Sequence, residues 1–131
     1  MEKALADAGV EPEEVQVVVA HGTSTPLNDA TESKAIRSAF GAHADRLAVT
    51  SNKSMIGHTL GAAGAMSALS AVLAIRDNLI PPTINYATPD PACDLDYVPN
   101  TARQAPVDVT IVNGFGFGGQ NAVAVIRRYE D

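Results

Sequence analysis

A chain of 131 residues can form one domain with a hydrophobic core but is too short for two. Its composition, 46% hydrophobic and 18% charged, is ordinary for a folded domain. The formal net charge of −6 argues against non-specific nucleic-acid binding, which needs a basic surface. The single cysteine excludes an intrachain disulfide and fits a reducing compartment, so we expect a cytoplasmic protein.

The first ten residues, "MEKALADAGV", predict the end of a helix that closes at Gly9. This stretch lacks the apolar core of a signal peptide. Residues 59–75 carry no charge, but the run is short for a membrane span and contains Ser67 and Ser70. We therefore expect no leader peptide and no membrane segment.

The β-branched run "VQVVVA" (15–20) predicts a strand that is buried on both faces, as in a parallel sheet. "HGTSTPLN" (21–28) follows as a loop. Asp29, with Glu32 three residues later, predicts a helix start of the capping-box kind, and Gly41 predicts its end. "RLAVTS" (46–51) predicts a second strand.

A further helix is expected from about residue 61 to 76, followed by a break before the prolines at 81 and 82. Residues 81–100 are proline-rich and irregular, with one short strand expected near 95–98. Residues 107–128 predict a hairpin with a glycine-rich turn. The order β-α-β-α-β-β indicates the α/β class, with a mixed sheet and helices packed on it.

His21 directly follows the first predicted strand, and ligands of open α/β sheets gather at the carboxyl ends of strands. The hydroxyls of Thr23, Ser24 and Thr25 could bind a polar ligand beside it. The competing interpretation is that His21 only holds a loop through backbone hydrogen bonds.

Lys53 and His58 follow the second strand in the same way and precede the start of a helix. That end carries about half a positive charge, which favours a neutral imidazole able to donate to an oxyanion. Otherwise Lys53 is a solvated lysine and His58 caps the helix. Gly61 and Gly64 predict a close approach of this helix to neighbouring backbone. We also expect Lys53 to pair with Glu32.

The turn "NGFGFGGQN" (113–121) lacks the lysine of a phosphate-binding loop. It either presents Phe115 and Phe117 to an apolar channel or forms a hairpin turn with aromatic plugs. Cys93 is expected to be buried and inert, and His43 to lie on the surface. No spacing predicts a metal site.

Together these motifs resemble the C-terminal half of the β-ketoacyl-acyl-carrier-protein synthases, condensing enzymes with a thiolase-like fold. "HGTSTPLND", "NKSMIGHTLGAAGA", "IRDNLIPPTINY", "CDLDYVPN" and "NGFGFGGQNAV" follow the family's order and approximate spacing. The resemblance therefore covers nearly all of residues 1–131 and implies a thiolase-like half-domain. The stretch from "PPTIN" to "CDLDYVP" is more similar to the free-standing elongating synthases, the synthase II type, than to modular polyketide ketosynthases.

The resemblance implies that His21 and His58 are the two active-site histidines. Lys53 would be the lysine upstream of the second, and Glu32 its acidic partner. In the implied reaction a cysteine carries the acyl chain, malonyl-carrier loses CO₂, and the histidines stabilise the developing enolate.

Further residues would serve the substrate arm. Thr23 and Thr25 would contact phosphopantetheine, Phe117 would gate the site, and Phe115 would lie nearby. Phosphopantetheine would arrive on the acyl carrier protein, so no metal or dissociable cofactor is implied. Family members of full length would be homodimers.

The nucleophilic cysteine of the family belongs to the N-terminal half, which this chain lacks, and Cys93 in "CDLD" does not match it. We therefore expect that the chain alone does not condense acyl groups and exposes an apolar face where the other half docks.

Two alternatives remain: a polyketide-type ketosynthase, or a non-catalytic subunit like the chain-length factors. The retained His21 and His58 disfavour the second. Thiolases are disfavoured because "NGFGFGGQN" has no cysteine, and the initiating synthases because they have asparagine at the second histidine.

Overall fold

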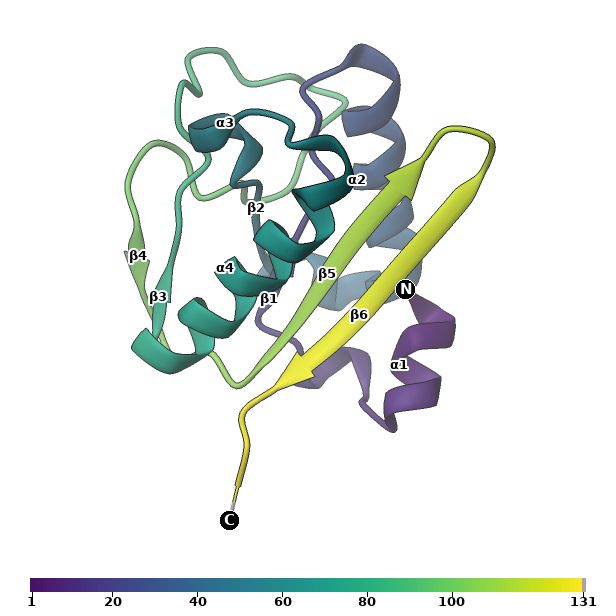
Figure 1. The fold of residues 1–131 in the computed structure, drawn as a ribbon, viewed down its shortest axis with the longest axis vertical. Helices are drawn as coiled ribbons and strands as arrows, with labels where there is room; N and C mark the ends of the chain where they lie inside the picture. Colours follow the sequence, from purple (N-terminus) through teal and green to yellow (C-terminus); the bar gives the residue numbers. More distant parts are fainter. Residues whose placement is uncertain (131) are drawn as a thin grey trace.

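The computed structural model describes residues 1–130 as a mixed sheet with helices on both faces (Figure 1). The helices are α1 (Glu2–Ala8), α2 (Pro26–Phe40), α3 (Lys53–Ile56) and α4 (Ala63–Asp77). The strands are β1 (Val17–Val19), β2 (Ala48–Thr50), β3 (Leu79–Ile80), β4 (Arg103–Gln104), β5 (Val109–Gly116) and β6 (Gln120–Arg127). Short 3-10 turns are η1 (Pro12–Glu14), η2 (Gly41–Arg46) and η3 (Leu60–Ala62).

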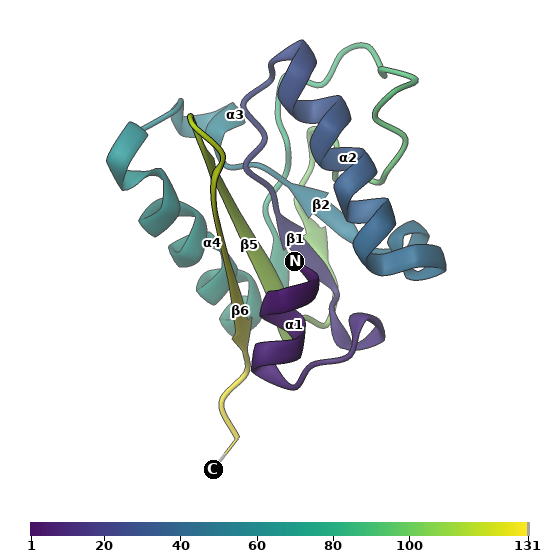
Figure 2. The same ribbon diagram turned by 90° about the vertical axis from the view of Figure 1, so that its right-hand side faces the viewer.

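The main sheet has the strand order β2-β1-β5-β6. Strand β1 runs parallel to both β2 and β5, with Val18 opposite Val49 and Ile111, and β6 returns antiparallel to β5. Figure 2 shows α1 and α2 on one face of the sheet and α4 on the other. The predicted parallel strands, hairpin and α/β class are confirmed.

The β1 valines explain why this strand is the centre of the fold, because all three are fully buried. Val18 packs into the cluster under α1 and α2, whereas Val17 and Val19 pack into the cluster under α4. A strand covered on both faces needs apolar residues at every position. The unbroken β-branched run is therefore the sequence signal for a strand in the middle of the sheet, covered on both faces.

Helix α1 ends as predicted, with Gly9 in the left-handed conformation at φ 61°. The predicted start of α2 at Asp29 is wrong. The helix begins at Pro26, and the Thr25 hydroxyl caps it by accepting the N–H of Asn28 at 3.4 Å. Asp29 instead accepts the N–H of Ser24 at 3.2 Å, so its carboxylate holds the preceding loop.

The region between β2 and α4 also differs from expectation. Lys53 lies inside the short helix α3, and α4 starts at Ala63 after the turn η3. The strand expected near 95–98 is reduced to one parallel bridge between Ala48 and Asp96. A small antiparallel sheet of β3 and β4 was not predicted.

Residues 81–100, here called the cover segment, lie along the outer edge of β2. The N–H of Val49 donates to the Asp96 carbonyl at 2.8 Å, which satisfies part of that edge. Arg37 of α2 binds both carboxylate oxygens of Asp94, and Ser33 of α2 is hydrogen-bonded to Tyr97. The segment is thus fixed by long-range polar contacts, which explains why local patterns assigned it no regular structure.

The prediction that His43 lies on the surface is wrong. Its side chain is buried, with only 8% of the residue exposed, and Nε2 lies 2.8 Å from the carbonyl of Val15. The imidazole therefore joins the turn η2 to the segment that leads into β1. The spacing of apolar residues could not predict that His43 is buried, because its ring is held by a polar contact with the main chain.

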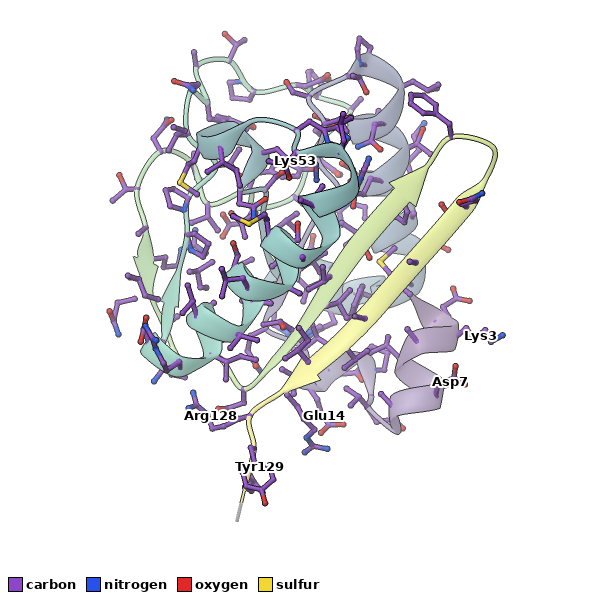
Figure 3. All side chains as sticks on the ribbon, in the orientation of Figure 1. Lys3, Asp7, Glu14, Lys53, Arg128 and Tyr129 are labelled. Atoms are coloured by element: carbon purple, nitrogen blue, oxygen red, sulfur yellow. The ribbon has the colours of Figure 1, made fainter. Side chains whose placement is uncertain are left out.

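Arg128 joins three chain segments at the base of the sheet (Figure 3). Its Nη2 donates to the carbonyls of Ile75 and Val107, at 2.6 and 2.9 Å, near the end of α4. We expect Arg128→Ala to lower the free energy of unfolding by about 1–2 kcal/mol, because these carbonyls lose a charged donor. Urea denaturation would measure the change. Arg127→Ala serves as the control because Arg127 is exposed; an equal loss in both variants would contradict this role.

The outer face of α4 remains open within residues 1–130. Leu69 and Val72 are 50% and 47% exposed, and an added Cβ at Gly61 or Gly64 would meet nothing within 4 Å. The predicted close backbone approach is therefore not made inside this chain, while the predicted exposed apolar face is present.

By length and composition, residues 60–77 could cross a membrane, with 28% of that stretch buried.

Candidate active site

His21 and His58 lie together at the carboxyl edge of the sheet. His21 follows β1, and His58 lies in the loop between α3 and η3. Their ring centres are 5.6 Å apart and the rings meet edge to face at 82°. The Phe115 ring packs against His21, with the two ring centres 5.7 Å apart. The two strand exits therefore bring both imidazoles to one place.

Main-chain amides fix the proton on both rings. The N–H of Phe115 donates to His21 Nδ1 at 3.3 Å, and the N–H of Leu60 donates to His58 Nδ1 at 3.1 Å. A ring nitrogen that accepts a hydrogen bond carries no proton, so each neutral imidazole has its hydrogen on Nε2. The site therefore offers two Nε2–H donors on neighbouring rings.

The surroundings of His21 favour its neutral form. Burial lowers the pKa of His21 below the ordinary value of 6.5, and the nearby positive charge of Lys53 lowers it further. The carboxylates of Glu32 and Asp29 oppose this shift in the pKa only partly. His21 is thus ready to donate a hydrogen bond near neutral pH.

This shift gives a pH prediction. Because the pKa of His21 is lower in the folded chain, its contribution to stability is fully present above pH 6.5 and is lost as pH falls through the folded pKa. We expect the NMR titration of His21 to move toward 6.5 in Lys53→Met, since a positive charge is removed. Lys34→Met, an exposed change on α2, should leave the titration in place. A downward shift in Lys53→Met would contradict the assignment.

Glu32 lies under the His21 turn as a buried carboxylate, with 4% of the residue exposed. Its oxygens accept the main-chain N–H groups of His21 and Gly22, at 2.8 and 2.9 Å. Nδ2 of Asn113 donates to the same carboxylate at 3.0 Å. Glu32 therefore holds the backbone that carries His21.

The expected ion pair between Glu32 and Lys53 is wrong in this structure, because no salt bridge joins them among the described residues. The Glu32 carboxylate is occupied by amide donors. Its charge still acts through space: burial lowers the pKa of Lys53, and Glu32 partly raises it again. The role of Asn113 was not found from the sequence, although the residue opens the glycine-rich motif "NGFGFGG".

Gly22 completes the turn in a conformation that only glycine adopts easily, with φ +45°. A Cβ at this position would lie 2.6 Å from Cβ of Ser51, so the two chain segments touch directly. The Ser51 hydroxyl donates to the Gly22 carbonyl at 3.0 Å. The end of β2 thus fixes the turn that follows β1.

The predicted substrate-arm residues fall into two groups. Thr23 and Thr25 lie beside the His21 turn, with their hydroxyls 3.0 Å apart. Phe115 contacts His21, whereas Phe117 at the hairpin tip has a fully exposed side chain (relative exposure 105%). The structure therefore groups Thr23, Thr25 and Phe115 with the histidine turn and leaves Phe117 in solvent.

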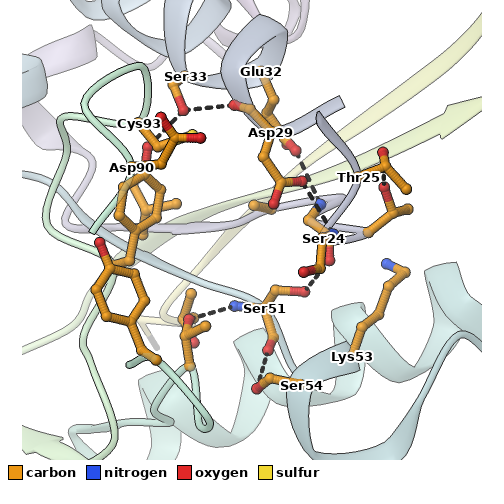
Figure 4. A pocket seen from close by; sticks show the side chains of 18 of the residues that line it. Ser24, Thr25, Asp29, Glu32, Ser33, Ser51, Lys53, Ser54, Asp90 and Cys93 are labelled. Atoms are coloured by element: carbon orange, nitrogen blue, oxygen red, sulfur yellow. Dashed lines mark hydrogen bonds between the residues drawn. The ribbon is translucent and has the colours of Figure 1, made fainter. Parts of the chain in front are cut away.

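A cavity of about 610 Å³ opens between α2, α3 and the cover segment (Figure 4). Figure 4 shows Lys53 extending along its wall toward the loop of Ser24 and Thr25. Cys93 also lines this cavity and is partly exposed, so the expectation of a buried cysteine is wrong. Within residues 1–130, no three His, Cys, Asp or Glu side chains gather closely enough to hold a metal ion.

Comparison with known proteins assigns the family. A family model described as "Beta-ketoacyl synthase, C-terminal domain" matches residues 1–87. The chain belongs to the beta-ketoacyl synthase family. This synthase segment is 55% identical over its whole length to the 3-oxoacyl-[acyl-carrier-protein] synthase 2 of Coxiella burnetii. It is 52% identical, over 97% of its length, to the synthase of the same name from a Synechocystis strain.

Solved structures show the same fold. One similar structure is a ketosynthase in complex with its type II PKS acyl-carrier protein and bound to a hexaketide (TM-score 0.95, 42% identity, 98% of this chain). Another is a beta-ketoacyl synthase from Burkholderia phymatum (TM-score 0.90, 40% identity, 97% of this chain). The synthase segment covers 31% of each of these two chains, and about a third of the two curated relatives, at 32% and 30%. The expected thiolase-like fold is confirmed.

Proposed function

We propose that this chain is the C-terminal part of a decarboxylating condensing enzyme that elongates acyl chains with malonyl-acyl-carrier protein in fatty acid synthesis. The pair of imidazoles, 5.6 Å apart and each with Nδ1 occupied by a main-chain amide, carries the proposal. The names of the 50–55% identical relatives support the substrate class.

The chemistry follows from the two Nε2–H donors. When the malonyl C–C bond breaks, CO₂ leaves and the electron pair passes into the thioester as an enolate. His21 and His58 donate hydrogen bonds to the enolate oxygen, where the negative charge develops. The carbanion then attacks an acyl-cysteine thioester, forming a C–C bond and releasing the cysteine thiolate. Burial and the positive charge of Lys53 both lower the pKa of His21, which keeps the imidazole neutral while it donates to the enolate oxygen.

The exposed face of α4 and the greater length of the relatives indicate which partners the proposed enzyme needs. The relatives are about three times as long as this chain, so their further residues would supply the nucleophilic cysteine and cover the outer face of α4. Phosphopantetheine would reach Thr23 and Thr25 while attached to the carrier, without a metal or separate cofactor. The whole enzyme would be a cytoplasmic homodimer.

A chimaera tests this proposal. The matching segment of the Coxiella burnetii synthase is replaced by this chain, and elongation of an acyl group with malonyl-carrier is followed by mass spectrometry. We expect a 3-oxoacyl product, and none from a chimaera with His21→Ala and His58→Ala. A folded chimaera with bound acyl-cysteine but no malonyl decarboxylation would overturn the proposal. The 131-residue chain alone is expected to form no product.

A polyketide-type ketosynthase is the second candidate, favoured by the TM-score of 0.95 to a ketosynthase bound to a hexaketide. The same assay separates the two activities. A fatty-acid enzyme stops at the 3-oxoacyl product until that product is reduced. A polyketide enzyme extends the unreduced product again, so repeated additions without a reductase would favour this candidate.

A further inference from the structure

Asn113 lies in β5 and is almost completely buried, with 1% of the residue exposed. Its Nδ2 donates to Oε1 of Glu32 at 3.0 Å, while its Oδ1 has no hydrogen-bond partner among the described residues. A buried carbonyl oxygen without a donor is unfavourable. The cost of burying the Asn113 side chain must therefore be offset by the hydrogen bond that its Nδ2 donates to Glu32. The opposite amide orientation would place Oδ1 against the Glu32 carboxylate, which fixes the assignment.

Strand β5 reaches the His21 turn by two routes. Through Asn113 it holds Glu32, whose oxygens accept the N–H groups of His21 and Gly22. Two residues further along, the N–H of Phe115 donates to Nδ1 of the His21 ring. The same strand therefore controls both the peptide and the imidazole of His21.

The Glu32 carboxylate is fully used in this network. Oε1 receives His21 N–H and the Asn113 amide, and Oε2 receives Gly22 N–H and the Asn28 amide, the last at 3.2 Å. Asn28 lies one turn before Glu32 on α2, so it cannot tie the carboxylate to the sheet. Asn113 is the side chain that links Glu32 to β5.

We propose that Asn113 is a positioning residue that sets the place and tautomer of His21 through Glu32. The inference rests on the proposed function, because its purpose is to align His21 with His58. Without Asn113, Glu32 loses its tie to β5. The His21 peptide then moves away from the Phe115 N–H, and the ring is free to carry its proton on Nδ1.

The test uses long-range ¹H–¹⁵N NMR on the 131-residue chain, in which only His21, His43 and His58 give imidazole signals. We expect wild-type His21 to show the Nε2–H tautomer and Asn113→Leu to show a mixture. Hydrogen exchange of the His21 and Gly22 amides should become about tenfold faster or more. Thr110→Val removes another buried polar group of β5 and should leave the His21 signals unchanged. A folded Asn113→Leu chain with wild-type tautomer and exchange would overturn the inference.

Asn113→Asp keeps the inference testable if the leucine variant does not fold. A protonated carboxyl at position 113 can donate to Glu32, whereas two facing carboxylates repel. The His21 signals should match those of the wild type while the new carboxyl is protonated and be disturbed once it ionises. Signals that stay wild-type after the carboxyl at position 113 has ionised, as followed by its own ¹³C shift, would contradict the inference.

The chimaera adds a kinetic readout. There, Asn113→Leu should lower kcat for decarboxylation and leave KM unchanged, because the substrate still binds while His21 is misaligned. Wild-type NMR signals in Asn113→Leu, together with an active chimaera, would overturn the inference alone. A wild-type chimaera that folds and forms the acyl-cysteine but does not decarboxylate malonyl-carrier would overturn the proposed function alone.

Discussion

Replacing His58 by alanine in the chimaera is expected to slow malonyl decarboxylation by about 10²–10³-fold, the usual effect of losing one oxyanion donor. His58 is exposed and its only hydrogen bond in the described chain is from the N–H of Leu60, so stability should change little. Decarboxylation measured as CO₂ release isolates this step from the transfer of the acyl chain to cysteine.

Two further variants sharpen the test of His58. His58→Gln places an amide N–H near the position of Nε2, and we expect it to restore part of the lost rate. His43→Gln alters a histidine whose ring, within residues 1–130, bonds only the Val15 carbonyl, so it should lower stability without slowing the folded enzyme. An equal slowing by His43→Gln and His58→Ala would mean that the rate reports folding and not charge stabilisation.

Gly22→Ala is expected to reduce the stability of the fold strongly, because the change combines steric overlap with backbone strain. The new Cβ would lie 2.6 Å from Cβ and 2.7 Å from Oγ of Ser51, at a φ of +45°. We expect the free energy of unfolding to fall by about 2–4 kcal/mol and His21 to leave its contact with the Phe115 N–H. Urea denaturation and the NMR tautomer of His21 measure the two effects separately.

The chain supplies matched controls for this variant. Gly9 also has positive φ, at +61°, but a Cβ there would meet nothing within 4 Å. Gly9→Ala should therefore show only the backbone strain of about 1–2 kcal/mol. Ser51→Gly removes the overlap but also the hydroxyl that donates to the Gly22 carbonyl. Gly22→Ala should therefore cost less stability when it is added to Ser51→Gly than when it is added to the wild type. An equal cost in both backgrounds would show that the overlap with Ser51 is not the cause.

The parts of the fold that the sequence predicted are those with a local signal. The unbroken β-branched run around Val18 specified a strand buried on both faces, and alternation with glycines specified the β5–β6 hairpin. The placement of His21 and Lys53 after strand ends pointed to the correct edge of the sheet. These features depend on residues close together in the sequence, so sequence patterns alone can predict them.

Two of the errors share one physical cause, namely contacts with partners that are distant in sequence. Glu32 was expected to pair with Lys53, but amides from the His21 turn and from Asn113 satisfy it instead. The error at the start of α2 is local: Thr25 displaced Asp29 as the helix cap because Pro26 fits the first helical position. His43 is held by a single polar contact to Val15. None of these choices has a periodic signature.

The two amides that hold the imidazole protons belong to residues 60 and 115, and both come from the main chain. Every amino acid except proline supplies such an N–H. Side chains at these two positions can therefore differ among relatives to suit different acyl groups while the main-chain N–H groups that donate to the two Nδ1 atoms are kept. Proline at either position would remove the N–H, and β-branched residues at position 60 would be strained by its positive φ of 51°. A directed-evolution library that excludes these residues can vary specificity while it keeps both N–H donors.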